Sequence, residues 1–352
     1  MSQLVLAINP GSTSTKLAVF SREKLELKLS FAIDEEHISK ENVYKEYPFR
    51  KSQIEAVLKE NKIDKIDIVI ARGGIFHPMK SGAYPVNDKM IKDAKLARYG
   101  NHASNLGAVF ARYFGEKFSA PAYIIDPVVV DEFPDIARVS GTPGIVRRSL
   151  SHALNIKATT RGVCDKNGWE IEKENFVVAH MGGGISVCAM KNDRMLDVND
   201  ALLGMGPFSP ERAGALPLRG LLDLIYDKQM DKGAITKLLS RESGLKGYLG
   251  TNDVREVVKR IETGDEKAKL ILDAMIYQIR KEVGSMAAVL DFKVKALIFT
   301  GGIAYSDYVI GELQKHLSEQ FYIEIHPGEN ELGAMRDGGF RILDNKMKIY
   351  EY

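Results

Sequence analysis

The chain has 352 residues, 45% of them hydrophobic and 27% charged, and a net charge of +2. This length fits two domains better than one, and the balanced charge argues against a nucleic-acid or membrane partner. The two cysteines, Cys164 and Cys188, are too few for a disulfide framework or a zinc site and favour a reducing, cytoplasmic location. The N-terminal apolar stretch is too short for a signal peptide, and no apolar run reaches the roughly 18 residues of a membrane span.

The first predicted elements form a hairpin. Apolar runs at 4–8 and 17–20 flank the turn PGSTSTK and predict two antiparallel strands. Apolar spacing then predicts a helix, a strand, an amphipathic helix and a short buried strand. They span 50–62, 66–71, 103–117 and 122–125.

The same pattern begins again in the second half of the chain. The strand 176–180 (FVVAH) meets a glycine turn, MGGGIS, and a return strand follows at 187–190. Helical segments follow, and the strand 296–300 then runs into a third turn, TGGIA. The helical segments lie around 221–226, 254–261 and 267–290. A strand–turn–strand unit repeated after about 170 residues predicts two α/β domains of one plan, each with a mixed sheet.

The three turns that follow apolar strands share a composition suited to anions. Small residues expose successive backbone N–H groups, which cradle phosphates, and Lys16 adds a positive charge to PGSTSTK. A single such turn could be a plain polar hairpin, but three favour a nucleotide. Neither a complete G-x-x-x-x-G-K-[ST] loop nor a G-x-G-x-x-G between strand and helix is present.

The order of motifs resembles the acetate and butyrate kinase family over nearly the whole chain. The set comprises NPGSTSTK, ARGG, HASNLGA, SHALN, HMGGGIS, SPERAG, GTNDVR, FTGGI and ENELGAMRD. INPGSTSTK and HMGGGIS are most similar to the butyrate kinases of that family. The resemblance implies two duplicated actin-like ATPase (ribonuclease H-like) domains with a cleft between them. It places them at 1–127 plus 331–352 and at 128–330.

The resemblance also implies a reaction, its cofactors and an assembly. ATP, with Mg²⁺, would phosphorylate a short-chain carboxylate, butyrate above all, and the enzyme would be a homo-oligomer, a dimer or higher. Acetate, propionate and isobutyrate kinases remain alternatives, and a non-catalytic actin-like ATPase or binding module is an alternative of another class. Because a carboxylic acid of pKa about 4–5 is already ionised at neutral pH, catalysis needs positive charge and positioning rather than a general base.

Four residues are assigned to catalysis by the resemblance. Arg72, at a strand end, and Arg212, in SPERAG, would hold the substrate carboxylate and the transferred phosphoryl group, although either could be a solvated surface arginine. Asp126 would orient the reacting groups, and the alternative is a strand-end aspartate that caps a turn. His180, next to three glycines, would donate to the phosphoryl group, and the alternative is a packing residue.

Further substrate, nucleotide and metal contacts follow from the same resemblance. Gly74, His102 and Arg148 are assigned to the substrate, with Asn105 bracing the turn after His102; helix capping is the alternative for His102. The nucleotide contacts are Asn9, Ser12, Lys16, Gly182, Gly183, Gly184, Asp253, Arg255, Gly301, Gly302 and Ile303. Glu331, with Asn9, is assigned to Mg²⁺, which prefers oxygen ligands.

Two positions depart from the acetate kinase pattern. Acetate kinases carry R-V-V-H-G-G at the first arginine, and Gly74 replaces the second valine, which lines the acetate pocket. This predicts room for a longer acyl chain, worth about 0.8 kcal/mol per buried methylene. Arg148 stands where H-G-T-S-H has its first histidine, and His152 matches the second. Arg148 could neutralise phosphoryl charge, or Arg147 and Arg148 could both be surface residues.

Overall fold

The computed structural model describes residues 3–39 and 41–352. The chain forms two compact units, each with its own mixed sheet. Unit 1 consists of Met1–Asp131 and Asn330–Tyr352, and unit 2 of Glu132–Glu329. The chain therefore leaves unit 1, builds the whole of unit 2, and returns to complete unit 1.

The sheet of unit 1 has six strands in the order β3-β2-β1-β4-β6-β5. Their bounds are β1 (Val5–Pro10), β2 (Ser14–Phe20), β3 (Leu25–Ala32), β4 (Ile68–Arg72), β5 (Ala83–Pro85) and β6 (Ala122–Ile125). The central strand β1 pairs antiparallel with β2, as the hairpin motif predicts, and parallel with β4. Every residue of β1 is buried, as expected for a strand covered on both faces.

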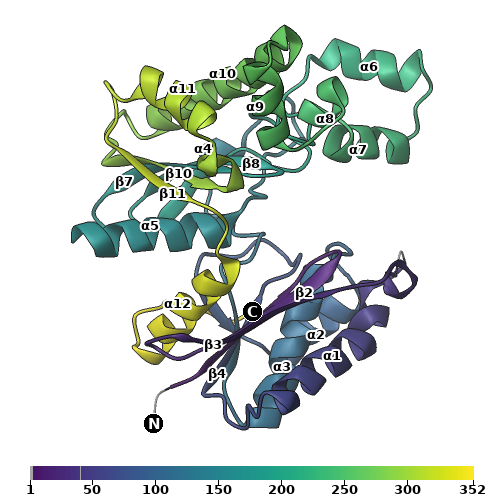
Figure 1. Cartoon of the computed structure of the whole chain (residues 1–352), viewed down its shortest axis with the longest axis vertical. Coiled ribbons are helices and arrows are strands. Elements are labelled where there is room, and N and C mark those ends of the chain that lie inside the picture. Colours follow the sequence, from purple (N-terminus) through teal and green to yellow (C-terminus); the bar gives the residue numbers. More distant parts are fainter. Residues whose placement is uncertain (1–2, 40) are drawn as a thin grey trace. The chain divides into compact units, whose positions relative to one another are not determined.

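Helices cover both faces of this sheet (Figure 1). Unit 1 holds η1 (Glu35–His37), η2 (Val43–Glu46), α1 (Tyr47–Glu60), α2 (Asp88–Lys95), η3 (Ala103–Asn105), α3 (Leu106–Phe118) and α12 (Glu331–Leu343). Gly339 of α12 packs against Val5 and Ile70, whereas Gly107 of α3 packs against Ala71. Since neighbouring residues of a strand face opposite sides, α12 and α3 lie on opposite faces of the sheet.

Unit 2 repeats the topology of unit 1. Its strands are β7 (Asn175–Met181), β8 (Ile185–Lys191), β9 (Arg194–Val198), β10 (Ala296–Gly301) and β11 (Ile323–Pro327). Their order, β11-β10-β7-β8-β9, matches β6-β4-β1-β2-β3 strand for strand. The hairpin pair β7–β8 is antiparallel and the pair β7–β10 is parallel, as in unit 1. The predicted duplication of one α/β plan with mixed sheets is confirmed.

The helices of unit 2 also lie on both faces of its sheet (Figure 1). They are α4 (Asp135–Arg138), α5 (Ala153–Asn167), α6 (Leu218–Tyr226), α7 (Lys232–Arg241), α8 (Gly244–Leu249), α9 (Val254–Glu262), α10 (Glu266–Val289), η4 (Gly302–Tyr305) and α11 (Asp307–Leu317). Val177, Ala179 and Met181 of β7 face the core beneath α10. His180, between two of them, therefore faces the opposite side, where α5 packs.

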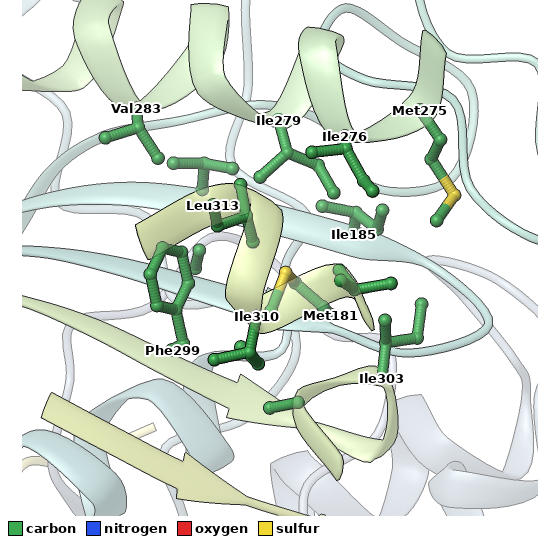
Figure 2. Packing of buried hydrophobic residues seen from close by; sticks show 14 of the residues in the cluster. Met181, Ile185, Met275, Ile276, Ile279, Val283, Phe299, Ile303, Ile310 and Leu313 are labelled. Atoms are coloured by element: carbon green, nitrogen blue, oxygen red, sulfur yellow. The ribbon is translucent and has the colours of Figure 1, made fainter. Parts of the chain in front are cut away.

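The long helix α10 organises the core of unit 2 (Figure 2). Asp265 caps its first turn by accepting the Ala268 N–H at 2.9 Å. Ile276, Ile279 and Val283 follow at helical spacing and are nearly or fully buried against the sheet. Phe299 of β10 packs in the same cluster.

The apolar residues of the helices pack in the cores of the two units. None of the helices in residues 3–39 and 41–352 is both long and apolar enough to cross a membrane. Cys164 and Cys188 are buried free thiols. Burial raises the pKa of both, that of Cys164 to about 12, so both thiols are protonated at neutral pH and weakly reactive.

We predict that Phe299→Ala lowers the free energy of unfolding of unit 2 by about 3–5 kcal/mol, since it leaves a cavity in a fully buried cluster. The chain has a single tryptophan, Trp169 in unit 2, so its fluorescence during urea unfolding reports on this unit.

Phe292→Ala is the matched control, because this phenylalanine is 70% exposed; its effect should stay within about 0.5 kcal/mol. Equal losses for the two variants would contradict the packing described.

Candidate active site

Strand register gathers three of the predicted residues at one edge of the unit 1 sheet. Asn9 of β1 lies directly opposite Lys16 of β2, so both side chains are on one face. Ile8 pairs with Ala71 in the parallel ladder, which brings Arg72 beside Asn9. This face is the one that α12 covers. Lys16 is exposed, as is Ser12 at the tip of the β1–β2 turn.

The first residue of α12 meets these strand ends. The Asn9 amide donates to a carboxylate oxygen of Glu331, and Arg72 Nη1 lies 3.1 Å from the other oxygen. The helix start is fixed by Asn330, whose side chain accepts the Gly333 N–H at 3.0 Å. A charged cluster of Asn9, Arg72 and Glu331 thus forms from three separate segments of unit 1.

The residues assigned to Mg²⁺ fit a divalent cation. Asn9 is only 4% exposed, and among the described residues its Oδ1 has no hydrogen-bond partner. A buried amide oxygen beside the Glu331 carboxylate supplies the oxygen donors that Mg²⁺ prefers. The orphaned oxygen also incurs a desolvation penalty that a cation would remove.

The turn after Arg72 corrects one expectation. A Cβ on Gly74 would lie 2.4 Å from Asn105 Oδ1 and 2.6 Å from Asn105 Cα. Asn105 is buried there, accepting the Ile75 N–H at 2.8 Å and donating to the Gly100 carbonyl at 2.7 Å. The hypothesis that Gly74 opens room for an acyl chain is therefore wrong. Glycine is needed because Asn105 backbone fills the space, and Asn105 does brace the turn.

His102 and Asp126 both hold turns in unit 1. His102 precedes η3, and its Nδ1 accepts the Ser104 N–H at 3.2 Å. Asp126 is buried, adopts a positive φ of 36°, and accepts from Ser81 Oγ at 2.7 Å and from the Gly82 N–H at 2.8 Å. Capping contacts of this kind were the alternative to catalysis at both positions, whose catalytic and substrate roles stay predictions.

In unit 2, register places a polar row across three strands. His180 of β7 pairs with Ser186 of β8 and with Thr300 of β10, all on the α5 face. Asn155 of α5 reaches this row, with Nδ2 at 2.8 Å from His180 Nδ1 and 3.1 Å from Thr300 Oγ1. His152, at the start of α5, stacks on His180 with ring centroids 4.0 Å apart.

The hydrogen-bond chain fixes the tautomer of His180. Thr300 donates its hydroxyl proton to the Gly328 carbonyl at 3.3 Å, so it accepts from Asn155. The Asn155 group between Thr300 and His180 is therefore the NH₂, and His180 Nδ1 accepts. The imidazole proton consequently resides on Nε2, which lies 2.9 Å from a carboxylate oxygen of Glu329.

The glycine turn between β7 and β8 fits closely among these groups. A Cβ on Gly182 would lie 2.7 Å from Glu329 Oε1, and one on Gly184 would lie 2.0 Å from Arg212 Nη1. Arg212 Nη1 itself donates to the Ala201 carbonyl at 2.6 Å. Burial lowers the pKa of Arg212, but a guanidinium stays charged at neutral pH. The turn thus lies beside His180 at Gly182 and beside Arg212 at Gly184, and the catalytic roles of both residues stay predictions.

A cavity of about 1090 Å³ extends from this turn within unit 2. It is lined by Gly182, Gly183, Pro210, Asn252, Asp253, Val254, Arg255, Val258, Lys259, Glu262, Gly302, Ile303, Tyr305, Ser306, Asp307 and Tyr308. Six predicted nucleotide residues are in that set, and Gly301 adjoins Gly302 at the end of β10. The volume suits a nucleotide-sized ligand.

Asp253 and Arg255 form a fixed pair on the wall of this cavity. The Asp253 carboxylate accepts the Arg255 backbone N–H at 2.9 Å and its Nη2 at 2.7 Å. The Arg255 guanidinium lowers the pKa of Asp253 to about 2. The carboxylate is therefore ionised at neutral pH, and it caps the start of α9.

The two arginines of the 147–148 loop differ in environment. Arg147 makes a bidentate pair with Asp197 at 2.9 and 2.6 Å and donates to the Ala137 carbonyl at 2.8 Å. Arg148 has a side chain that is 71% exposed, with Nε 3.7 Å from Asp200. Arg147 therefore braces the loop, and a substrate role for Arg148 stays a prediction.

Several residues of the unit 2 site carry no role in the sequence-based assignment. They are His152, Asn155, Ser186, Thr300 and Glu329. The motif SHALN could have indicated two of them, because His152 and Asn155 are three residues apart and therefore lie on one face of a helix. Strand register adds Ser186 and Thr300, and Glu329 comes from the segment that follows β11; neither relation is visible in local sequence.

Comparison with known proteins assigns the family. Residues 143–346 match the acetokinase family. Two proteins of Clostridium botulinum, strains Alaska E43 / Type E3 and Eklund 17B / Type B, are each named "probable butyrate kinase". Each is 42% identical to this chain over 355 residues, which cover 99% of this chain and 100% of the relative. The chain belongs to the acetokinase family.

Solved structures show the same fold. An acetate kinase of Porphyromonas gingivalis superposes with a TM-score of 0.78 and 21% identity, covering 97% of this chain and 100% of the other. A propionate kinase of Francisella tularensis superposes with a TM-score of 0.76 and 20% identity, covering 95% of this chain and 98% of the other. The resemblance to the acetokinase family that the motifs predict is thus confirmed, and with it the actin-like ATPase fold.

For this acetokinase family member, Gly184→Ala should lower kcat by about 100-fold while the melting temperature changes little. The added methyl group would displace the flexible end of Arg212, and loss of one charge-stabilising group costs a factor of this order. Steady-state kinetics and thermal melting of the purified variant measure both quantities.

Gly284→Ala in α10 is the control for Gly184→Ala, since nothing lies within 4 Å of the added Cβ, and its kcat should stay unchanged. A Gly184→Ala variant with full kcat would contradict the placement of Arg212.

Gly74→Val should destabilise unit 1 by about 1–3 kcal/mol and lower kcat/KM for short and long acids by similar factors. The valine would press on the Asn105 backbone rather than fill an acyl pocket. Thermal melting and kinetics with acetate and butyrate measure the two effects.

Gly141→Val, at a loop glycine with open space around it, serves as the control for Gly74→Val. A rise in KM for butyrate alone, with unchanged melting, would restore the pocket hypothesis.

Proposed function

We propose that this protein transfers the γ-phosphoryl group of ATP to the carboxylate of butyrate, forming butyryl phosphate and ADP. One observation carries the proposal: a nucleotide-sized cavity in unit 2 ends at a glycine turn bordered by His180 and Arg212. The names of the 42% identical relatives support butyrate as the acid. Family membership supports a cytoplasmic homo-oligomer that uses ATP and Mg²⁺.

The nucleotide is assigned to unit 2. Its base and ribose would occupy the cavity between α9 and η4, where Asp253 and Arg255 form one wall. Its phosphates would extend to the turn Gly182–Gly184. Gly183 has open space around its Cβ position, so a phosphate can approach this backbone closely.

His180 presents a hydrogen-bond donor toward the glycine turn. Asn155 occupies Nδ1, so Nε2 is the ring nitrogen that donates on the side of that turn. A donor fixed before the reaction stabilises the charge that develops on the phosphoryl oxygens, because no reorganisation is needed. Arg212 adds a permanent positive charge beside the same turn.

The carboxylate is assigned to unit 1, with Arg72 as its main partner. An ionised acid attacks phosphorus directly, so the enzyme must offset the repulsion between two anions. The Arg72 guanidinium, which now pairs with Glu331, would bind the acid and neutralise its charge. Glu331 and Asn9 would hold Mg²⁺, which when bound supplies positive charge for anionic groups of the substrates.

The decisive experiment measures kcat/KM with Mg-ATP for acetate, propionate, butyrate, isobutyrate and valerate, with acyl phosphate trapped by hydroxylamine. We expect the highest kcat/KM at butyrate, and no product without a divalent cation. A maximum at acetate or propionate would keep the reaction but reject butyrate. Absence of acyl phosphate with every acid would reject the proposal in favour of a binding protein.

The same assay tests the assignment of the carboxylate to Arg72. Arg72→Gln should lower kcat/KM by about 100-fold. Arg112→Gln removes an equal charge from unit 1, where Arg112 Nη2 donates to Asp88 at 2.8 Å on the exposed surface, and should leave the rate unchanged.

A further inference from the structure

A buried arginine lies directly beneath the β1–β2 hairpin of unit 1. Arg50 of α1 is fully buried. Its Nη1 donates to the Gly11 carbonyl at 2.8 Å, to Thr15 Oγ1 at 3.0 Å and to the Ser14 carbonyl at 3.4 Å. All three acceptors lie in the segment PGSTSTK, which spans the β1–β2 turn and the start of β2.

The rest of the guanidinium is held by a buried carboxylate. Arg50 Nε and Nη2 donate to one oxygen of Glu46 at 2.9 and 2.5 Å. The other oxygen of Glu46 accepts the Ser39 N–H at 2.9 Å. The pair is electrically neutral, so it contributes little net charge to the hairpin. Because a buried ion pair is often no more stabilising than apolar residues of equal volume, stability alone does not account for it.

The geometry of the Gly11–Ser12 peptide group indicates a role for Arg50. The C=O and N–H of one planar trans peptide point in opposite directions. Since the Gly11 carbonyl points inward to Arg50, the N–H of Ser12 in the same peptide points outward. Ser12 and Thr13 are exposed on that outer side. The Gly11 N–H is already used, because it donates to the Ser14 carbonyl at 2.7 Å and closes the turn.

We propose that Arg50 is a positioning residue that holds the Gly11–Ser12 peptide so that the Ser12 N–H points outward as a hydrogen-bond donor for an anionic group of the substrate. This inference rests on the proposed function, in which unit 1 binds the anionic acid. Arg50 touches neither substrate. It acts through the backbone, and its fork of donors is what allows one side chain to fix two carbonyls and a hydroxyl at once.

The test compares Arg50→Lys with the wild-type protein at a temperature well below both melting transitions. Lysine keeps the charge but lacks the fork, so the carbonyls lose their fixed partner. We expect kcat to fall about 10- to 100-fold, as for other small misplacements of a binding group. The dissociation constant of ADP should change less than about two-fold, because its cavity lies in unit 2. Hydrogen exchange in a peptide covering residues 9–16 should become faster.

Ile54→Ala is the matched control. Ile54 is fully buried on the same helix, and its apolar side chain cannot hydrogen-bond to the hairpin. This variant should therefore lower stability while kcat and exchange of residues 9–16 stay at wild-type values. A folded Arg50→Lys variant with wild-type kcat would overturn the inference. An equal loss of kcat in Ile54→Ala would do the same, since it would show a merely structural effect.

A second variant covers the case in which Arg50→Lys does not fold. Thr15→Val removes one acceptor of Arg50 and preserves the shape of the side chain. A several-fold fall in kcat with faster exchange supports the inference, and unchanged values reject it. If the wild-type protein forms no acyl phosphate, the proposed function fails by itself; unchanged exchange in Arg50→Lys would reject the positioning role separately.

Discussion

A strand that is covered by helices on both faces can carry a functional polar side chain only near its end, and this constraint shapes both units. β1 and β7 are buried along nearly their whole length. Each has a polar residue at its penultimate position, Asn9 in β1 and His180 in β7. The small-residue turn that follows leaves these side chains as the last groups before solvent, where a ligand can reach them.

Each of these buried polar groups needs a partner, and in both units a helix start provides it. Glu331 begins α12 and binds Asn9, while Asn155 in the first turn of α5 binds His180. Inside the protein such bonds are strong, and an unpaired group is costly. The partners therefore fix the orientation of Asn9 and His180 before any ligand arrives, which is the condition for electrostatic preorganisation.

Much of this architecture could be predicted from the sequence, because its signals are local. Apolar runs with small-residue turns predict β1–β2 and β7–β8, and their repetition predicts two units of one plan. The edge strands β3, β5, β9 and β11 were not predicted. β3 alternates between half-buried and exposed residues, and β5 has only three residues, so neither carries a strong apolar run.

The errors and omissions at the site have physical causes. A glycine that replaces a larger residue can mean open space or a close backbone approach, and at Gly74 it means the second. Thr300 joins His180 through the parallel pairing of β7 with β10, strands some 120 residues apart, and Glu329 comes from the segment that follows β11. No local pattern encodes either contact. Arg50 stands among polar helix residues and resembles a surface arginine, yet three acceptors of a distant hairpin enclose it.

The discontinuity of unit 1 has a consequence for the order in which the protein is made. The sheet of unit 1 is covered on one face by α12, which consists of residues Glu331–Leu343 and is translated after the whole of unit 2. Unit 2 is continuous, from Glu132 to Glu329, and domains fold as units during synthesis. Unit 2 is thus complete on the ribosome before unit 1, although its synthesis begins later. Until α12 is made, one apolar face of the unit 1 sheet stays uncovered and is a surface that chaperones can shield.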